Sequence, residues 1–154
     1  MAQQAVFMVR KEVTPAMWPG MTRFLLSFHP TTAVDMYSSG QGGSLLKALA
    51  YSISKGWTGL HLLDYSGTAA DVDHEQYAIL AELLARRCPS LRHLRLNNLQ
   101  NSMSTVCMSH ISMLSPTLSS LDLSLNAVCP SGASFIAEAL TLSQIGRGGE
   151  CASV

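Results

Sequence analysis

Large apolar residues follow a repeating plan along the chain, clearest from Leu118 to Leu140, LSSLDLSLNAVCPSGASFIAEAL. In the first half of this stretch the leading leucines come at steps of three and two, which is typical of a short, largely buried strand. In the second half Gly132, Ile136 and Leu140 come at steps of four, which predicts a helix. The stretch therefore predicts one strand followed by one helix.

Three earlier segments repeat the apolar spacing of the strand half. The matching residues are Met21, Phe24 and Leu26, then Trp57, Leu60 and Leu62, then Leu91, Leu94 and Leu96. A proline stands two residues before three of the four segments, at Pro19, Pro89 and Pro116. Because proline ends a helix and favours extended chain, it supports this alignment. The units then begin near residues 21, 57, 91 and 118, at intervals of 36 (57 − 21), 34 (91 − 57) and 27 (118 − 91) residues.

Helical patterns lie between and after these strands. Ser44 is the expected N-cap of one helix, which Gly56 ends. Asp73 is the expected N-cap of the next, with Gln76 at the spacing of a capping box. A weaker pattern covers Met103 to Leu114. Ser131 is the expected cap of the fourth helix, whose predicted buried residues are Phe135, Ile136, Ala139 and Leu140. The predicted order is strand then helix, four times, which is an α/β fold class.

The last unit resembles a leucine-rich repeat of the ribonuclease-inhibitor-like type, LxxLxLxxNxLxxxGxxxLxxxL, with Val128 and Ile136 in leucine positions. The resemblance implies a leucine-rich-repeat solenoid, with short parallel strands on the concave face and helices on the convex face. In that family the asparagine, here Asn126, bonds the turn backbone of its neighbours. Earlier units carry His29, Tyr65 and Leu99 at that place. An ordinary α/β domain is the alternative architecture.

The repeats divide the chain into three parts. Residues 1–20 are expected to form an N-terminal cap or irregular segment, residues 21–140 the repeats, and residues 141–154 a flexible C-terminal tail. Neither end carries the polar outer face that normally closes a repeat array. We therefore expect the chain to belong to a longer repeat protein, or to self-associate through its uncapped ends.

Charge and cysteine usage narrow the classes of partner. Ten basic residues balance ten acidic residues. The chain therefore lacks the excess of positive charge that binds nucleic acid or an anionic membrane. No stretch approaches the roughly 18 apolar residues of a membrane span. The four cysteines are widely spaced, without a CxxC pair, which is typical of reduced thiols in a cytoplasmic protein.

Motifs for chemistry are absent from the sequence. It contains no HExxH, GxSxG, GxGxxG or GxxxxGK[ST] pattern. The acidic run from Asp71 to Glu82 has Gln76 where a calcium loop needs glycine. Cys88 follows a predicted helix C-terminus, where the helix dipole raises a thiol pKa. We therefore expect no metal, no cofactor and no enzymatic activity.

The predicted concave face is the expected binding surface. Adjacent strands lie about 4.8 Å apart, so Arg95 and Asp122 are expected to pair across them, beside His61. The candidate partner-binding residues are Arg23, Leu25, Phe28, His61, Leu63, His93, Arg95, Asn97 and Asp122. The resemblance implies a protein–protein interaction module. The alternatives are a regulatory fragment of a repeat-built GTPase activator, or a truncated product without independent function.

Overall fold

A computed structural model describes residues 5–9, 20, 23, 31–37, 42–66, 74–97, 102–114 and 116–142. Its five-stranded parallel sheet consists of β1 (Ala5–Val9), β2 (Thr31–Tyr37), β3 (Leu62–Ser66), β4 (His93–Asn97) and β6 (Ser120–Asp122), in that spatial order. The helices are α2 (Gly42–Ser54), α3 (His74–Arg87), α4 (Thr105–Leu114) and α5 (Pro130–Leu142). A short second sheet pairs β5 (Ser102–Met103) with β7 (Ala127–Val128). The predicted α/β class, with strands alternating with helices, is confirmed.

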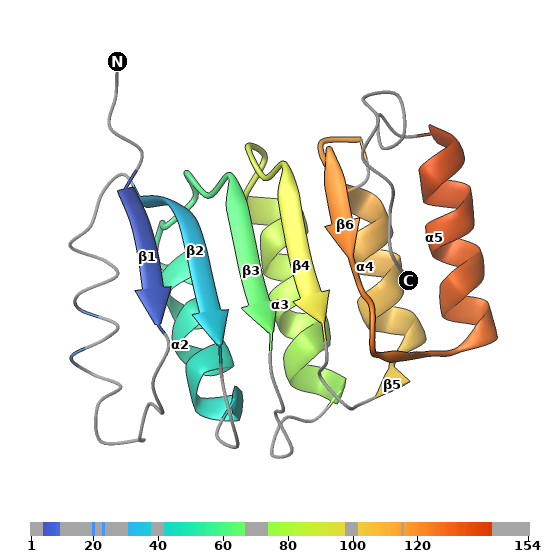
Figure 1. Ribbon diagram of the computed structural model, residues 1–154, viewed down its shortest axis with the longest axis horizontal. Coiled ribbons are helices and arrows are strands. Elements are labelled where there is room, and N and C mark those ends of the chain that lie inside the picture. Colours follow the sequence, from blue (N-terminus) through green and yellow to red (C-terminus); the bar gives the residue numbers. More distant parts are fainter. Residues whose placement is uncertain are drawn as a thin grey trace.

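The helices form one layer and the large sheet another (Figure 1). Helices α2, α3, α4 and α5 pack side by side in chain order, each against the next. The strands run in front of them in the same order, which leaves one face of the sheet turned away from the described helices. Within the described ranges, no helix combines the length and apolarity needed to cross a membrane.

The sheet register sets a regular interval between units. Its central row consists of the paired residues Phe7, Val34, Leu63, Leu94 and Leu121. Successive members are 27 (34 − 7), 29 (63 − 34), 31 (94 − 63) and 27 (121 − 94) residues apart. These intervals are more uniform than the 36, 34 and 27 predicted from the apolar pattern.

One backbone hydrogen-bond arrangement occurs at two successive strands. The carbonyl oxygen of His61 accepts from the amides of Arg92 and His93, at 2.8 and 3.1 Å. The carbonyl oxygen of Arg92 accepts in turn from Ser119 and Ser120, at 2.7 and 3.0 Å. Strands β4 and β6 therefore each begin with the same connection to the preceding strand. This connection fixes how far each strand is shifted along its neighbour.

The predicted alignment of the second unit is wrong by three residues. Leu63, and not Leu60, lies opposite Leu94. The segment from Leu60 to Tyr65 also satisfies LxxLxL, with tyrosine in the last apolar place. The observed register buries Leu60, Leu63 and Tyr65 completely. The predicted register would have turned Leu63 towards solvent, so the hydrophobic effect favours the observed one.

The strand beside β3 is not the one predicted at Met21, Phe24 and Leu26, which themselves lie outside the described residues. Gly20 and Arg23 are both helical, and the strand that pairs with β3 is Thr31–Tyr37. Thr31, Val34 and Met36 occupy the LxxLxL positions of this strand when its pairing with β3 sets the alignment. This match was not recognised in the sequence because its first position holds a threonine and not a leucine. Within the expected N-terminal cap or irregular segment, Ala5–Val9 form strand β1, at the edge of the sheet beyond β2.

Burial alternates along the central strands. Leu94 and Leu96 are buried while His93 and Arg95 are exposed, as predicted for positions facing the helices and the open face. Leu121 and Leu123 repeat this pattern in and just after β6. Helix α3 buries an apolar stripe at Tyr77, Leu80, Ala81 and Leu84. In α5, Ile136 and Ala139 are buried, but Phe135 is exposed, contrary to prediction.

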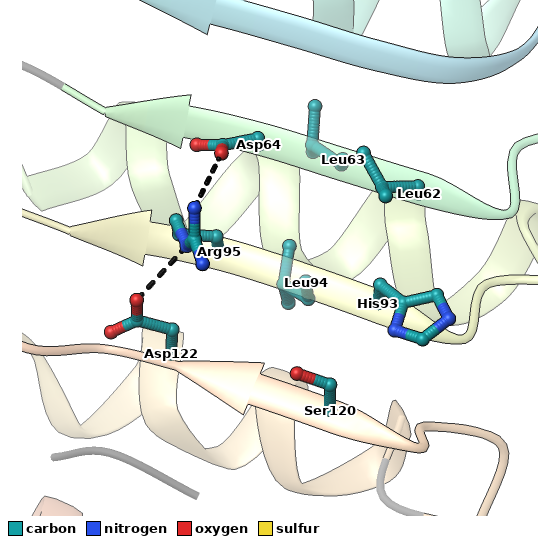
Figure 2. A pocket seen from close by; sticks show the side chains of 8 residues that line it. All are labelled: Leu62, Leu63, Asp64, His93, Leu94, Arg95, Ser120 and Asp122. Atoms are coloured by element: carbon teal, nitrogen blue, oxygen red, sulfur yellow. Dashed lines mark hydrogen bonds and ion pairs between the residues drawn. The ribbon is translucent and has the colours of Figure 1, made fainter. Parts of the chain in front are cut away.

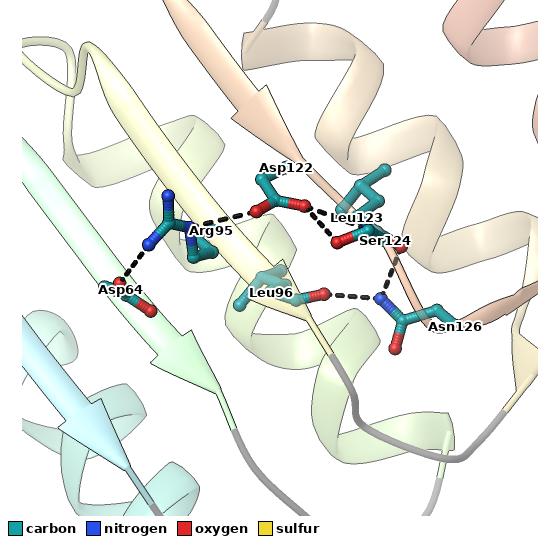
Figure 3. A network of polar contacts seen from close by, with 7 residues as sticks. All are labelled: Asp64, Arg95, Leu96, Asp122, Leu123, Ser124 and Asn126. Carbon is teal, nitrogen blue, oxygen red and sulfur yellow. Dashed lines mark hydrogen bonds and ion pairs between the residues drawn. The ribbon is translucent and has the colours of Figure 1, made fainter. Parts of the chain in front are cut away.

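Asn126 ties the turn after β6 to the neighbouring strand. Its side-chain amide donates to the carbonyl oxygen of Leu96 in β4 and, at 2.7 Å, to that of Leu123 (Figure 3). Leu125 just before it has a left-handed backbone, with φ of 61°. These bonds agree with the turn role that the resemblance implies for Asn126. They satisfy backbone carbonyls that a tight turn leaves without strand partners.

Close packing at Gly132 joins α5 to α4. Helix α5 begins at Pro130, so Cys129 is its N-cap and the prediction of Ser131 in that place is wrong. The Gly132 amide donates to Cys129 Sγ at 3.3 Å. A Cβ at Gly132 would lie 2.9 Å from Cγ of the buried Met108 and 3.2 Å from Cys129 Sγ. Only glycine lets the two helices approach this closely without displacing Met108.

We therefore expect Gly132→Ala to destabilise the protein. Overpacking costs typically 1–3 kcal/mol, and the gain of about 1 kcal/mol in helix propensity offsets only part of it. The free energy of unfolding, measured by urea titration, should fall by about 1 kcal/mol. Gly59→Ala is the matched control, since nothing lies within 4 Å of a Cβ at Gly59. Equal stability of the two variants would contradict the close-packing account.

Candidate functional site

The open face of the sheet carries a shallow hollow over β3, β4 and β6. Figure 2 shows the side chains around it. It has a volume of about 230 Å³ and is lined by Leu62, Leu63, Asp64, His93, Leu94, Arg95, Ser120 and Asp122. In-register pairing places Asp64, Arg95 and Asp122 in one row, and Leu62, His93 and Ser120 in another. The first row forms a charged end of the hollow. The second row forms a mixed end, with one leucine, one histidine and one serine.

Arg95 is held between two carboxylates at the charged end. Its Nη1 lies 3.0 Å from Asp64 Oδ2 and its Nε lies 3.0 Å from Asp122 Oδ2. The Arg95 side chain is 53% exposed, whereas Asp64 and Asp122 are 20% and 22% exposed. The two ion pairs therefore hold the guanidinium in a fixed orientation. The predicted ladder pair of Arg95 and Asp122 is confirmed.

Asp122 is fixed by a further pair of hydrogen bonds (Figure 3). Its Oδ1 accepts from the Ser124 hydroxyl at 2.6 Å and from the Ser124 amide at 3.0 Å. Partial burial raises the pKa of Asp122, but the Ser124 hydrogen bonds and the charge of Arg95 outweigh it and hold the pKa below its ordinary value. Asp122 is therefore a carboxylate at neutral pH.

Four predicted site residues lie on the open face. His93, Arg95 and Asp122 line the hollow, and Asn97 lies at the end of β4 on the same side as Arg95. Leu63 also borders the hollow, but it is completely buried, so its side chain is not presented on the open face.

The other predicted residues lie elsewhere or are not described. His61 precedes β3, with its Nδ1 3.0 Å from the Gly59 carbonyl oxygen, so it does not flank Arg95. Arg23 is exposed and helical, and is not part of a strand. Leu25 and Phe28 lie outside the described residues.

Leu94 and Ser120 line the hollow although they were not among the predicted site residues. The same is true of Asp64 and Leu62. Both follow from the corrected register, which brings Asp64 to the place expected of His61. The signal was present as the second LxxLxL match, at Leu60, Leu63 and Tyr65. With that match, this unit begins 31 residues (91 − 60) before the next one. This interval is closer than the predicted 34 to the 27 residues between the last two units.

A second polar cluster lies where α4 and α5 begin. Cys129 Sγ is 3.4 Å from Ser131 Oγ and 3.7 Å from Thr105 Oγ1. The Ser131 hydroxyl, the Gly132 amide and the Thr105 hydroxyl lower the pKa of the Cys129 thiol. Burial instead raises the pKa of Cys88 and of Cys107 to about 12. The upward direction expected for Cys88 is thus confirmed, with burial as the cause.

No protein-family model, curated protein or solved structure matches this chain. Within the part of the chain that the structure describes, no group of three or more histidine, cysteine, aspartate or glutamate side chains is placed to hold a metal ion.

We expect the carboxyl group of Asp122 to titrate below 3.8, its ordinary value, when followed by carbon-detected NMR. Because the folded-state pKa is lowered, ionised Asp122 stabilises the fold above the unfolded-state pKa, and this contribution is lost as the pH falls through the folded-state value. Arg95→Gln and Ser124→Ala should each raise the midpoint. Arg86→Gln, which breaks an exposed ion pair on α3, should not. A midpoint at or above 3.8 in the native protein would contradict the network.

We expect Cys129 to be the fastest-reacting of the three described cysteines. The reaction of Ellman's reagent with a Cys151→Ser protein at pH 7 should show one fast thiol, since reactivity follows thiolate population and access. Cys129→Ser should remove that phase, and Ser131→Ala should slow it. Similar rates for Cys88, Cys107 and Cys129 would count against this assignment.

Proposed function

We propose that this chain is an array of leucine-rich repeats of the ribonuclease-inhibitor-like type. The support is the interval of 27 to 31 residues between paired strands, with a helix between each of the last four strands. The repeated amide connections at His61 and Arg92 and the turn bonds of Asn126 are further support. A stacked array of this kind buries one side of its strands and leaves the other side for binding.

We propose further that the chain binds a protein partner through the open face of β3, β4 and β6. The observation that carries this proposal is the fixed, half-exposed Arg95 in a hollow on that face. Arginine is enriched among residues that dominate binding energy, and a preordered side chain loses less entropy on binding. The described helices lie behind the sheet, so a partner can approach this face directly.

Size and charge favour a protein partner over other ligands. At about 230 Å³ the hollow is smaller than the roughly 300–1,000 Å³ of typical small-molecule sites. The two carboxylates beside Arg95 would repel a nucleic-acid phosphate, which is also negatively charged. Both are ion-pair partners of Arg95, and Asp122, with its lowered pKa, is a poor proton donor at neutral pH. We therefore propose binding and not catalysis.

Photo-crosslinking can test this surface. A benzoylphenylalanine in place of His93 on the open face would be compared with one in place of Glu138, which is exposed on α5. In extracts of cells that express the chain, discrete adducts should form from position 93 and not from position 138.

A steric variant provides the control. Ser120→Trp would fill the hollow without changing charge and should abolish the adducts from position 93. Glu138→Trp, on the helix side, should leave them intact. Adducts that form equally from both positions, or that persist in Ser120→Trp, would contradict binding through the open face.

A further inference from the structure

We infer that the partner inserts one aromatic side chain into the hollow, where its ring stacks on the guanidinium of Arg95. This inference rests on the proposed function, because it names the chemistry of what binds the same face. The occupant is a protein segment that presents phenylalanine, tyrosine or tryptophan and carries no excess charge beside it.

The two ion pairs determine which way the Arg95 guanidinium faces. The N–H groups of a guanidinium lie in its plane, and Arg95 directs Nη1 towards Asp64 and Nε towards Asp122, on the strands to either side (Figure 2). Because the side chain rises from β4 on the open face, the plane extends across the strands and its flat faces point along β4. One face is turned towards His93, two residues earlier on the same side of the strand, and forms a wall of the hollow.

The charges at this wall favour a neutral occupant. Asp64 and Asp122 each lie 3.0 Å from a nitrogen of Arg95. An acidic side chain would approach these two carboxylates, and a basic one would approach a guanidinium that already lies between them. An aromatic ring carries no net charge, and the negative face of the ring attracts a guanidinium. Stacking covers a face of Arg95 and leaves the in-plane bonds to both aspartates intact.

The size and lining of the hollow fit one ring. Successive outward-facing residues of a strand are about 6.6 Å apart, and a ring in contact with the guanidinium lies about 3.5 Å from it. The ring therefore falls between Arg95 and His93. The volume of about 230 Å³ exceeds that of a cavity of about 150 Å³ that holds benzene in another protein. The half-buried Leu62, next to His93 in the row, supplies an apolar contact.

The test begins with selection of random twelve-residue peptides displayed on phage against the immobilised chain. Peptides that also bind the Ser120→Trp variant are removed first, so the remaining peptides depend on the hollow. The enriched peptides should share one aromatic residue, and their Kd, measured by fluorescence anisotropy, should change little as salt rises. Alanine in place of this residue should raise Kd roughly thirtyfold, the effect of a residue that dominates binding.

Cyclohexylalanine in place of phenylalanine at the shared position separates stacking from apolar burial. It keeps a six-membered ring and removes the π electrons, so Kd should rise about two- to fivefold, the size of a partly exposed cation–π contact. Arg95→Lys keeps the charge between the aspartates but removes the flat face. It should raise Kd by a similar factor for the phenylalanine peptide and leave that of the cyclohexylalanine peptide unchanged. Arg86→Lys, in the ion pair with Glu82 on α3, is the matched control and should change neither Kd.

NMR of the native protein supplies a readout that does not depend on a variant folding. The Nε–Hε signal of Arg95, assigned by its loss in Arg95→Lys, should move upfield when the phenylalanine peptide binds, because the proton then lies over the face of the ring. The cyclohexylalanine peptide should not produce this shift.

Each outcome has a distinct meaning. Enriched peptides without a shared aromatic residue, or an Arg95 signal that does not move upfield, would overturn stacking while leaving binding through the open face intact. Acidic peptides whose binding weakens steeply with salt would do the same. Failure to enrich any peptide that depends on the hollow would count against stacking alone, because crosslinking tests the face independently. If crosslinking also fails, both proposals are wrong.

Discussion

In-register pairing of parallel strands is the constraint on which the remaining structure depends. Once Leu63, Leu94 and Leu121 are paired and buried towards the helices, the next residue of each strand must face the other way. Those next residues are Asp64, Arg95 and Asp122. The charged row on the open face is thus a direct consequence of how the core is buried. A slip of one residue would expose the leucines and bury the charges.

Several local contacts hold this register in place. The amide connections at His61 and Arg92 set the height at which each strand begins. Asn126 fixes the far end by bonding to the carbonyl oxygen of Leu96. Gly132 lets α5 lie close against α4. The preordered Arg95 therefore depends on contacts made well away from it.

Much of the fold could be predicted from the sequence where the apolar pattern was unambiguous. The units containing Leu94 and Leu121 were aligned correctly, and with them the pairing of Arg95 with Asp122. The unit before them was misaligned because Leu60 fits two overlapping LxxLxL patterns. Burial of Leu63 and Tyr65 in the core distinguishes the two. The hollow could not be predicted completely, since Asp64 joins it only in the correct register. Local spacing does not specify which strand residues become neighbours.

Cross-strand NOEs in the native protein test the central claim most directly. Backbone proton NOEs between β3 and β4 would be measured on uniformly labelled protein. The structure predicts contacts between Asp64 and Arg95 and between Leu63 and Leu94, with Arg95 also contacting Asp122. Contacts between His61 and Arg95 in their place would establish the other register. The charged row, and with it the proposed binding surface, would then be wrong.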